Sequence, residues 1–315
     1  MDYKSFIQYV QQEIQNQYPD AEVIVNEVRK NNGKKLDSLV INENHDRIVP
    51  CIYLNPYYTK YQEGDSIDLI VNDILQKYQS AKGKNNLTDT DNYMLHNFSD
   101  FNAVKNRIIF KVINQEKNQE LLKTVPYKKV LDLAIVYMIL AKEEENEIGT
   151  ILITNDHMKL WEEDVETLHS YAIRNTPELL PVKIEAMESV LRNLVEGLDI
   201  DAEIEDGQSD IYVVTNRKGI HGAATMFYPD VIKEFRNREC QNIDKIYILP
   251  SSIHKSLLLP CNGAIKSKYL QEMVCDINRT QVMEEEVLSD NVYLYDAVQD
   301  KIYFASDHEK GEIIQ

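Results

Sequence analysis

The stretch that organises the chain is Ile-Leu-Pro-Ser-Ser-Ile-His-Lys-Ser-Leu-Leu-Leu-Pro, which spans residues 248–260. An apolar run that is typical of a β-strand, residues 246–249, leads to Pro250, and a second apolar run follows His254. Two hydroxyls and one imidazole therefore lie between hydrophobic segments. We interpret this stretch as a junction at which a strand is followed by a helix that begins near Ser252.

The structural interpretation of this junction makes Ser252 the N-cap of the helix. Lys255 then occupies the third helical position, where a capping box needs an acidic residue. It also places positive charge near the positive end of the helix dipole. We therefore expect this cap to be weaker by roughly several tenths of a kcal/mol.

The catalytic interpretation makes Ser251 or Ser252 a nucleophile, with His254 as its base. Ser251 and His254 are three residues apart and would share one side of the predicted helix. No Gly-x-Ser-x-Gly sequence surrounds the serines, and no acidic residue is marked as a partner of the histidine. The structural interpretation is favoured over catalysis and over a polar contact with a ligand.

Two other strand-like runs end with Thr-Asn and are each followed by a histidine. The first ends at Asn155 and is followed by His157, and the second ends at Asn216 and is followed by His221. These four residues are candidates for ligand binding, since amide and imidazole groups at paired strand ends could meet in one polar pocket. The alternative, which we favour, is that each asparagine starts a turn by bonding to its own backbone.

Composition limits the class of partner. The formal net charge is -18, and no Lys/Arg-rich run interrupts it. Nucleic-acid binders concentrate positive charge on one face, so we expect a protein partner or self-association rather than a nucleic acid. No motif for a cofactor, a metal ion or a phosphate-binding loop is present, and we predict none of these ligands.

The cysteines and the apolar runs bear on location. Four cysteines form no C-x-x-C pair and no zinc spacing, which is typical of free thiols in a reducing compartment. The longest apolar run, Val130 to Ala141, has about 12 residues and contains Asp132, whereas a membrane helix needs about 20. The N-terminal residues lack the pattern of a signal peptide. We expect a cytoplasmic protein without a membrane segment.

Hydrophobic periodicity predicts an α+β protein in three parts. Residues 1–95 form an N-terminal helix, β-meander and helix unit, with a tight turn at Asn31-Asn32-Gly33. Residues 96–204 form a central section with a long hairpin and helices. Residues 205–315 form a C-terminal mixed α/β section, which either is a separate domain or shares one with residues 96–204.

The predicted elements follow the chain in order. The first part has helices at 3–18 and 65–80, with strands at 22–29, 36–42 and 48–54. The central part has long strands at 127–141 and 149–154, with helices at 161–172 and 184–198. The last part has strands at 211–215, 223–227 and 245–249, helices at 229–236 and 266–283, and a closing hairpin of 291–295 with 301–304.

Short motifs spread along the chain carry a family resemblance. They are RKNNG at 29–33, IYL at 52–54, YY at 57–58, INQEKN at 113–118, PY at 126–127, LDLA at 131–134, ILITN at 151–155, NTP at 175–177, YP at 228–229, LPSSIH at 249–254 and VLSD at 287–290. With these motifs, most of the chain resembles a bacterial family of unknown function that is common among gut anaerobes. The chain departs from that family in having Lys255 in place of glutamate and His221 in place of asparagine, and the resemblance implies no activity.

Together these observations predict a non-catalytic binding or regulatory protein, because no complete catalytic set is present. The alternative is a hydrolase or transferase that uses Ser251 or Ser252 with His254 or His221. A hydroxyl within hydrogen-bond distance of an imidazole that has an acid behind it would favour the enzyme. A ring that is bonded only to backbone would favour a structural role for His254.

Overall fold

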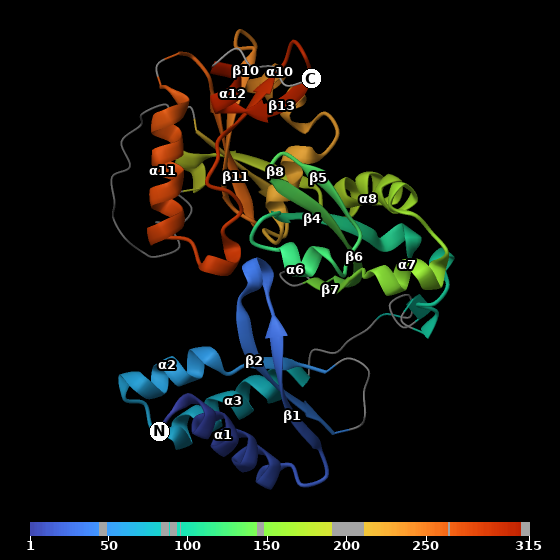
Figure 1. Cartoon of the computed structure of the whole chain (residues 1–315), viewed down its shortest axis with the longest axis vertical. Coiled ribbons are helices and arrows are strands. Elements are labelled where there is room, and N and C mark those ends of the chain that lie inside the picture. Colours follow the sequence, from blue (N-terminus) through green and yellow to red (C-terminus); the bar gives the residue numbers. More distant parts are fainter. Residues whose placement is uncertain are drawn as a thin grey trace. The chain divides into compact units, whose positions relative to one another are not determined.

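The chain is an α+β protein, and the computed structural model describes residues 1–43, 49–82, 88, 93–94, 96–143, 148–190, 211–263 and 265–309. Its contacts divide it into two compact units, Met1–Thr88 and Asp89–Gln315 (Figure 1). Among the residues so described, no helix combines the length and the apolar composition needed to cross a membrane.

The first unit is a three-stranded antiparallel meander covered by helices. Its strands lie in the order β1 (Glu22–Arg29), β2 (Lys35–Asn42) and β3 (Cys51–Tyr53). Its helices are α1 (Tyr3–Gln17), α2 (Asn55–Glu63) and α3 (Ile67–Lys82). The turn between β1 and β2 is a short 3-10 segment, η1 (Asn31–Gly33), in which Asn32 and Gly33 have the positive φ angles that the Asn-Gly pair predicts.

The core of this unit follows the predicted helical stripe. Phe6, Val10 and Ile14 of α1 are fully buried and pack with the apolar faces of the strands and of α3. These residues recur every four positions, so they lie on one side of the helix. Residues 55–58 begin α2, with Pro56 in its first turn, where a proline is tolerated.

The second unit contains two antiparallel sheets. In the first, β6 (Leu133–Glu143) pairs along one edge with β4 (Ile108–Asn114). Along its other edge β6 pairs with β5 (Tyr127–Val130) and then with β7 (Ile148–Leu152). The predicted single strand 127–141 is therefore wrong, because the chain reverses at Leu131 and Asp132. Leu131 has a φ of 53°, which is unusual for a leucine and hides the turn inside an apolar run.

The second sheet has six antiparallel strands in the order β13-β12-β10-β11-β9-β8. The strands are β8 (Val182–Ala186), β9 (Tyr212–Asn216), β10 (Lys245–Ser252), β11 (Lys255–Pro260), β12 (Tyr293–Asp296) and β13 (Lys301–Phe304). The closing hairpin of β12 and β13 is as predicted. Strands β4 to β7 of the central part thus form one sheet, whereas β8, which also belongs to residues 96–204, joins the C-terminal strands in the other.

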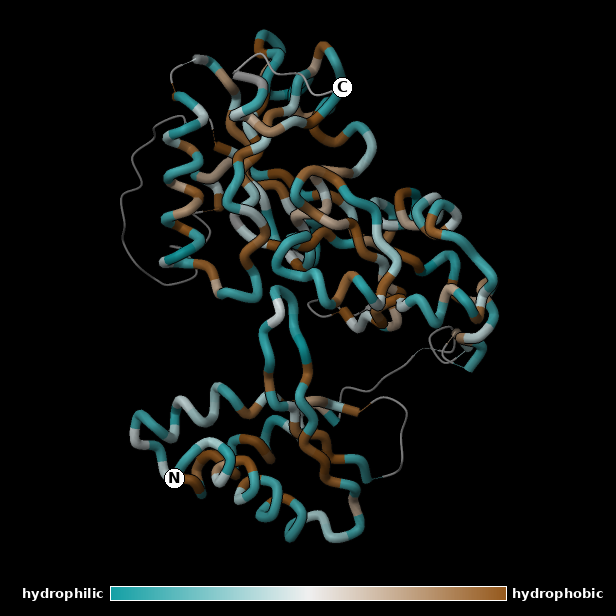
Figure 2. Tube along the Cα trace, viewed as in Figure 1, coloured by the Kyte–Doolittle hydropathy of each residue, from teal (hydrophilic) through white to brown (hydrophobic). Residues whose placement is uncertain are grey.

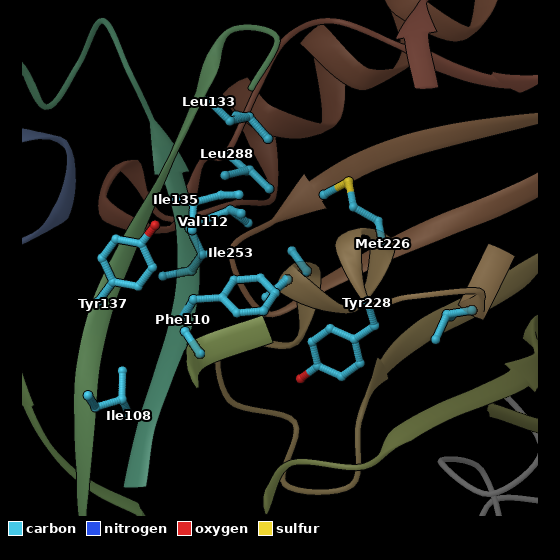
Figure 3. Close-up of a cluster of buried hydrophobic side chains, with 14 of the residues drawn as sticks. Ile108, Phe110, Val112, Leu133, Ile135, Tyr137, Met226, Tyr228, Ile253 and Leu288 are labelled. Carbon is cyan, nitrogen blue, oxygen red and sulfur yellow. The ribbon is translucent and has the colours of Figure 1, made fainter. Parts of the chain in front are cut away.

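A shared hydrophobic core joins these two sheets. Figure 3 shows Phe110 and Val112 of β4 facing Tyr228 and Ile253, which come from the C-terminal part of the chain. The rings of Phe110 and Tyr228 meet edge to face, with centroids 5.8 Å apart. In Figure 2 the strands of this unit carry mostly hydrophobic residues, while hydrophilic residues run along the outer side of helix α11 (Ser267–Thr280).

Strand β6 is buried and hydrophobic on both faces, so its sequence shows no period-2 pattern that would mark where the strand begins. This explains why the sequence did not predict the turn at Leu131.

Most of the other helices described in the second unit are short, and α8 is the long one among them. They are α5 (Phe101–Val104), α6 (Gln119–Leu122), α7 (Asn155–Trp161), α8 (Val165–Leu179), α10 (Val231–Glu239) and α12 (Ala305–Glu309), with 3-10 segments η2 (Lys105–Arg107), η3 (Gly222–Phe227) and η4 (Glu284–Glu286).

Three predicted elements of this unit differ from the structure. The predicted strand 223–227 is the buried 3-10 segment η3, and the predicted helix 161–172 is two helices separated at Glu162, which has a φ of 57°. In the predicted helix 184–198, residues 184–186 belong to strand β8, residues 187–190 are helical, and the residues from 191 lie outside the described residues. For residues 223–227 and 184–186 a short apolar run fits both a buried helix and a buried strand, and packing decides between them.

Candidate functional site

The Ser–His stretch is a β-hairpin, so the predicted helix with an N-cap at Ser252 is wrong. Strands β10 and β11 pair directly from Ser252 to Lys255, and Ile253 and His254 form the turn between them. The residues after Lys255 cannot form a helix because β11 pairs with β10 on one side and with β9 on the other. The register shifts between Leu249 and Ser252, which places Pro250 at a bulge, where a strand tolerates proline.

His254 has both ring nitrogens engaged. Its Nδ1 accepts the backbone N–H of His221 at 3.3 Å, and its Nε2 lies 3.6 Å from Oε1 of Glu286. The His221 and His254 rings are stacked, with centroids 5.9 Å apart. Because Nδ1 accepts a hydrogen bond, a neutral His254 carries its proton on Nε2, toward the glutamate.

The serines do not complete a catalytic set in the part of the chain that the structure describes. Oγ of Ser252 accepts the backbone N–H of His254 at 3.1 Å, and no described hydroxyl meets either ring nitrogen of that histidine. The side chain of Ser251 lies outside the described residues. The acid required for an enzyme is present in Glu286, but backbone occupies the position that a nucleophile would need.

Asn216 and His221 belong to the loop that supports this hairpin. Asn216 accepts the N–H of Lys218 and donates to the carbonyl of Ile220 at 2.8 Å, which is the turn-forming role of an asparagine. His221 has a φ of 55°, a left-handed conformation in which Asn, Asp and His are enriched. The next residue, Gly222, packs directly against Thr215 and the carbonyl of His254.

Asn155 and His157 belong to helix α7 rather than to the loop that contains Asn216 and His221. Asn155 donates to the carbonyl of Lys123 at 3.1 Å. His157 and Thr154 form a reciprocal cap of α7, in which His157 Nδ1 accepts the Thr154 N–H at 3.0 Å and Thr154 Oγ1 accepts the His157 N–H. The His157 ring stacks on Trp161, with centroids 5.6 Å apart. The two Thr-Asn strand ends therefore have separate partners in the described structure.

Burial of the His157 ring lowers its pKa below the ordinary value of 6.5, and the carboxylate of Asp156 opposes this shift. The unfolded chain therefore binds a proton at His157 more readily than the folded chain, so stability is complete above about pH 6.5 and falls as the pH decreases.

We expect a His157→Gln variant to lose less stability than the wild type when the pH falls from about 7 to about 5. Glutamine retains the capping geometry at this position but does not titrate. Urea unfolding at both pH values, followed by circular dichroism, measures the difference. Equal losses in the two proteins would contradict a neutral His157 in the folded state.

A groove of about 630 Å³ lies beside α6, β5 and the turn that follows β5. Three apolar side chains line it, Leu122, Leu131 and Phe304. The polar and charged lining residues are Gln115, Glu116, Gln119, Lys123, Tyr127, Lys129 and Asp132. Its size and mixed lining are typical of a ligand pocket, since such pockets measure about 300–1,000 Å³.

The carboxylate of Asp132, which lines this groove, is held in place by hydrogen bonds. This carboxylate accepts hydrogen bonds from Ser289 Oγ at 2.6 Å, Asn291 Nδ2 at 3.0 Å and the Tyr293 hydroxyl at 2.7 Å. Burial, and then the neighbouring Asp132, raise the pKa of Tyr293 well above its ordinary value, so this phenol remains a donor. The three bonds hold the turn of the β5–β6 hairpin against the segment that leads into β12.

Asn114 supports the wall of the groove that carries Gln115 and Gln119. Its side chain donates to the carbonyl of Leu288 and accepts the N–H of Lys117, both at 2.9 Å. Its own carbonyl accepts Nδ2 of Asn118 at 2.8 Å, which shapes the turn before α6. The wall that carries Gln115 and Gln119 is thus tied to the same C-terminal segment as Asp132.

Charges in the groove do not neutralise one another. Lys123 pairs with Glu120 outside the lining, at 2.6 Å. Within the described part of the chain, neither Glu116 nor Lys129 has an ion-pair partner, although both line the groove. The groove therefore offers the charges of Glu116 and Lys129, neither held in an ion pair, next to an apolar surface.

A protein-family profile covers residues 3–297, nearly the whole chain. The chain belongs to a family of unknown function, DUF5688. No curated protein and no solved structure matches the chain. All of the groove residues except Phe304 fall within the region that DUF5688 covers.

Sequence reasoning missed this groove of the DUF5688 chain, although one signal was present. Asp132 interrupts the most apolar run of the chain, and a charge in such a place needs partners. Those partners, Ser289, Asn291 and Tyr293, are between 157 and 161 residues away in sequence. No local pattern connects segments at that separation.

Proposed function

We propose that this DUF5688 chain is a cytoplasmic, non-catalytic binding or regulatory protein whose ligand occupies the groove beside α6 and β5. The observation that carries the proposal is the preorganised floor of the groove, where three donors fix the carboxylate of Asp132. Beside it lie the unpaired charges of Glu116 and Lys129. A binding site needs such fixed polar groups next to apolar surface, because fewer groups then have to be ordered when the ligand arrives.

The surroundings of His254 support a role without catalysis. A base must present one ring nitrogen to the nucleophile, but Nδ1 of His254 is bonded to the His221 backbone. The hydroxyl of Ser252 is bonded to backbone as well. The four cysteines are all free thiols, which fits a reducing compartment such as the cytoplasm.

A groove-filling substitution tests the proposal. Gln119→Trp places a large side chain at the lining of the groove, whereas Glu120→Trp adds the same side chain one position along α6 at an exposed residue that does not line it. Each protein is immobilised, exposed to a clarified cell extract and washed. Mass spectrometry then identifies the bound small molecules, peptides and proteins.

We expect the wild type and the Glu120→Trp control to retain a common ligand that Gln119→Trp loses by about tenfold or more. Gln119 is exposed, so we expect the fold to be unaffected, and thermal unfolding followed by circular dichroism verifies this, because the added tryptophan would mix with the fluorescence of Trp161. A ligand retained equally by all three proteins would place binding elsewhere on the chain. The absence of any retained ligand would contradict the proposal.

A further inference from the structure

The register of the first sheet shows which backbone groups of β5 are unpaired. The N–H of Gln115 bonds to the carbonyl of Asp132 at 3.0 Å, so Asp132 directs its carbonyl toward the β4 side of the hairpin. In an antiparallel ladder the direction alternates with each residue, so Leu133 directs its backbone groups toward β5 and pairs there with Val130. Tyr127 and Lys129 then direct their N–H and C=O groups away from β6, at the free edge of β5 (Figure 1).

The outer edge of β4, in contrast, is covered by side chains. The N–H of Phe110 donates to Thr176 Oγ1 at 3.1 Å, and the carbonyl of Ile108 accepts Nδ2 of Asn175 at 3.1 Å. Within the described residues no such bond reaches the outward backbone groups of Tyr127 and Lys129. This sheet therefore has one edge closed by helix α8 and one edge of β5 open beside the groove.

The opposite side of the groove is also a strand edge. The N–H of Ala305 bonds to the carbonyl of Val292 at 3.0 Å, so by the same alternation Ile302 and Phe304 direct their backbone groups away from β12. Strand β13 ends its sheet, and Phe304 lines the groove together with Tyr127 and Lys129. The groove thus lies between residues of two edge strands.

We infer that the ligand of this groove is an extended peptide segment of a partner protein, which adds as a strand to the free edge of β5. This inference rests on the proposed function and names the ligand class. In strand addition, main-chain hydrogen bonds supply affinity and alternate side chains supply specificity. The outward N–H and C=O groups of Tyr127 and Lys129 are the main-chain partners.

The lining predicts the chemistry of the peptide. Lys129 is unpaired and favours an acidic side chain on the peptide. Leu122, Leu131 and Phe304 favour an apolar side chain. Side chains on one face of a strand recur every second residue, so the acidic and the apolar residue are separated by one position.

A second copy of this chain is a poor occupant of the same edge. Strand β5 carries Lys128 and Lys129 side by side, and antiparallel pairing of two β5 strands would place lysines opposite lysines. Like charges opposite each other destabilise a strand pair. Lysines on a short edge strand also prevent indiscriminate edge pairing, which agrees with a site that prefers an acidic residue next to Lys129.

The experiment selects ligands from a random library of short linear peptides displayed on phage, with the full chain as the target. The affinity of a selected peptide is then measured for the wild type and for Lys129→Pro. Proline removes the outward N–H of residue 129 but leaves the ladder with β6 intact, because prolines are tolerated on the free side of edge strands. Lys129→Ala is the matched control, since it removes the charge and keeps the N–H.

We expect selected peptides to contain an acidic and an apolar residue separated by one position. Lys129→Pro should weaken binding about tenfold, and Lys129→Ala about threefold. On the wild type, N-methylation of the peptide should weaken binding at alternate residues only. The N-methylation experiment uses the wild-type protein, so its result does not depend on whether the Lys129→Pro variant folds correctly.

Several outcomes would overturn the inference. They are equal binding of the selected peptides to Lys129→Pro or Gln119→Trp, N-methylation effects that do not alternate, and no selected peptide at all. If a ligand from the cell extract is still lost in the Gln119→Trp variant, the groove remains a binding site and only the inference that its ligand is a peptide is wrong. Dimerisation of the chain that Lys129→Pro abolishes would make a second copy the occupant and would also overturn the inference.

Discussion

An Asp132→Ala variant is expected to lose about 3–4 kcal/mol of unfolding free energy in the second unit. The substitution removes the acceptor of three hydrogen bonds and leaves the donors of Ser289 and Tyr293 buried without it. A buried donor left unsatisfied costs roughly 1–3 kcal/mol, and two such donors account for the expected loss.

The measurement is urea unfolding followed by fluorescence. Trp161 is the only tryptophan of the chain and packs in the core of the second unit, so its signal reports on that unit. Asp132→Asn keeps the shape and one acceptor oxygen, and we expect a smaller loss of about 1–2 kcal/mol. The exposed Asp276→Ala is the control and should change stability by no more than about 0.5 kcal/mol. An Asp132→Ala variant as stable as this control would mean that the network does not hold the two segments together.

A Gly222→Ala variant is expected to lose about 3 kcal/mol or more. A Cβ at this position would overlap Thr215 Oγ1 and the carbonyl oxygen of His254, with the Asn216 nitrogen only 2.9 Å away. Two of these three atoms belong to backbone, the Asn216 nitrogen in β9 and the His254 oxygen in the hairpin turn, so they cannot move aside as a flexible side chain does. Overpacking at such a site costs roughly 1–3 kcal/mol and more where backbone must shift.

Gly219→Ala, in the same loop, separates crowding from backbone conformation. A Cβ on Gly219 meets no atom within 4 Å, but its φ of +67° is unfavourable for alanine. We expect a loss of about 1 kcal/mol from that conformation alone. Unfolding midpoints of both variants, again followed by Trp161 fluorescence, give the comparison. Similar losses in the two variants would show that the loop relaxes around the added methyl group, and would contradict the close packing of His254 on Gly222.

Short-range patterns predicted the elements that do not depend on distant partners. Helix α1 follows from the spacing of Phe6, Val10 and Ile14, because one face of an isolated helix is enough to define it. The hairpin of β1 and β2 follows from Asn32-Gly33, whose positive φ angles are a local preference.

The predictions failed where apolar residues continued without a period. Residues 127–141 contain a turn, and residues 223–227 form a 3-10 segment. Residues 133–141 and 223–226 are buried, so alternation between polar and apolar residues is absent there. The chain after Ser252 continues as a strand rather than a helix because β9 and β10 supply hydrogen-bond partners on both sides.

The candidate groove could not be found from local sequence. Asp132 marked a charge that needed partners, but Ser289, Asn291 and Tyr293 were identified only by the fold. The open edge of β5 is likewise a property of the sheet, since it depends on which strand has no neighbour.

The sequence by itself determined the α+β class, the family, the helix–meander unit at the N-terminus and the closing hairpin. Those features depend on local periodicity, on turn preferences and on motifs that are read directly from the chain. Only the tertiary structure decided that the Ser–His stretch is a hairpin turn and that Asp132 supports a groove beside an open strand edge. The physical reason is that burial and strand pairing depend on neighbours that are distant in sequence, strand β9 for the Ser–His stretch and Ser289, 157 residues away, for Asp132. These neighbours choose among conformations that the local sequence leaves nearly equal in free energy.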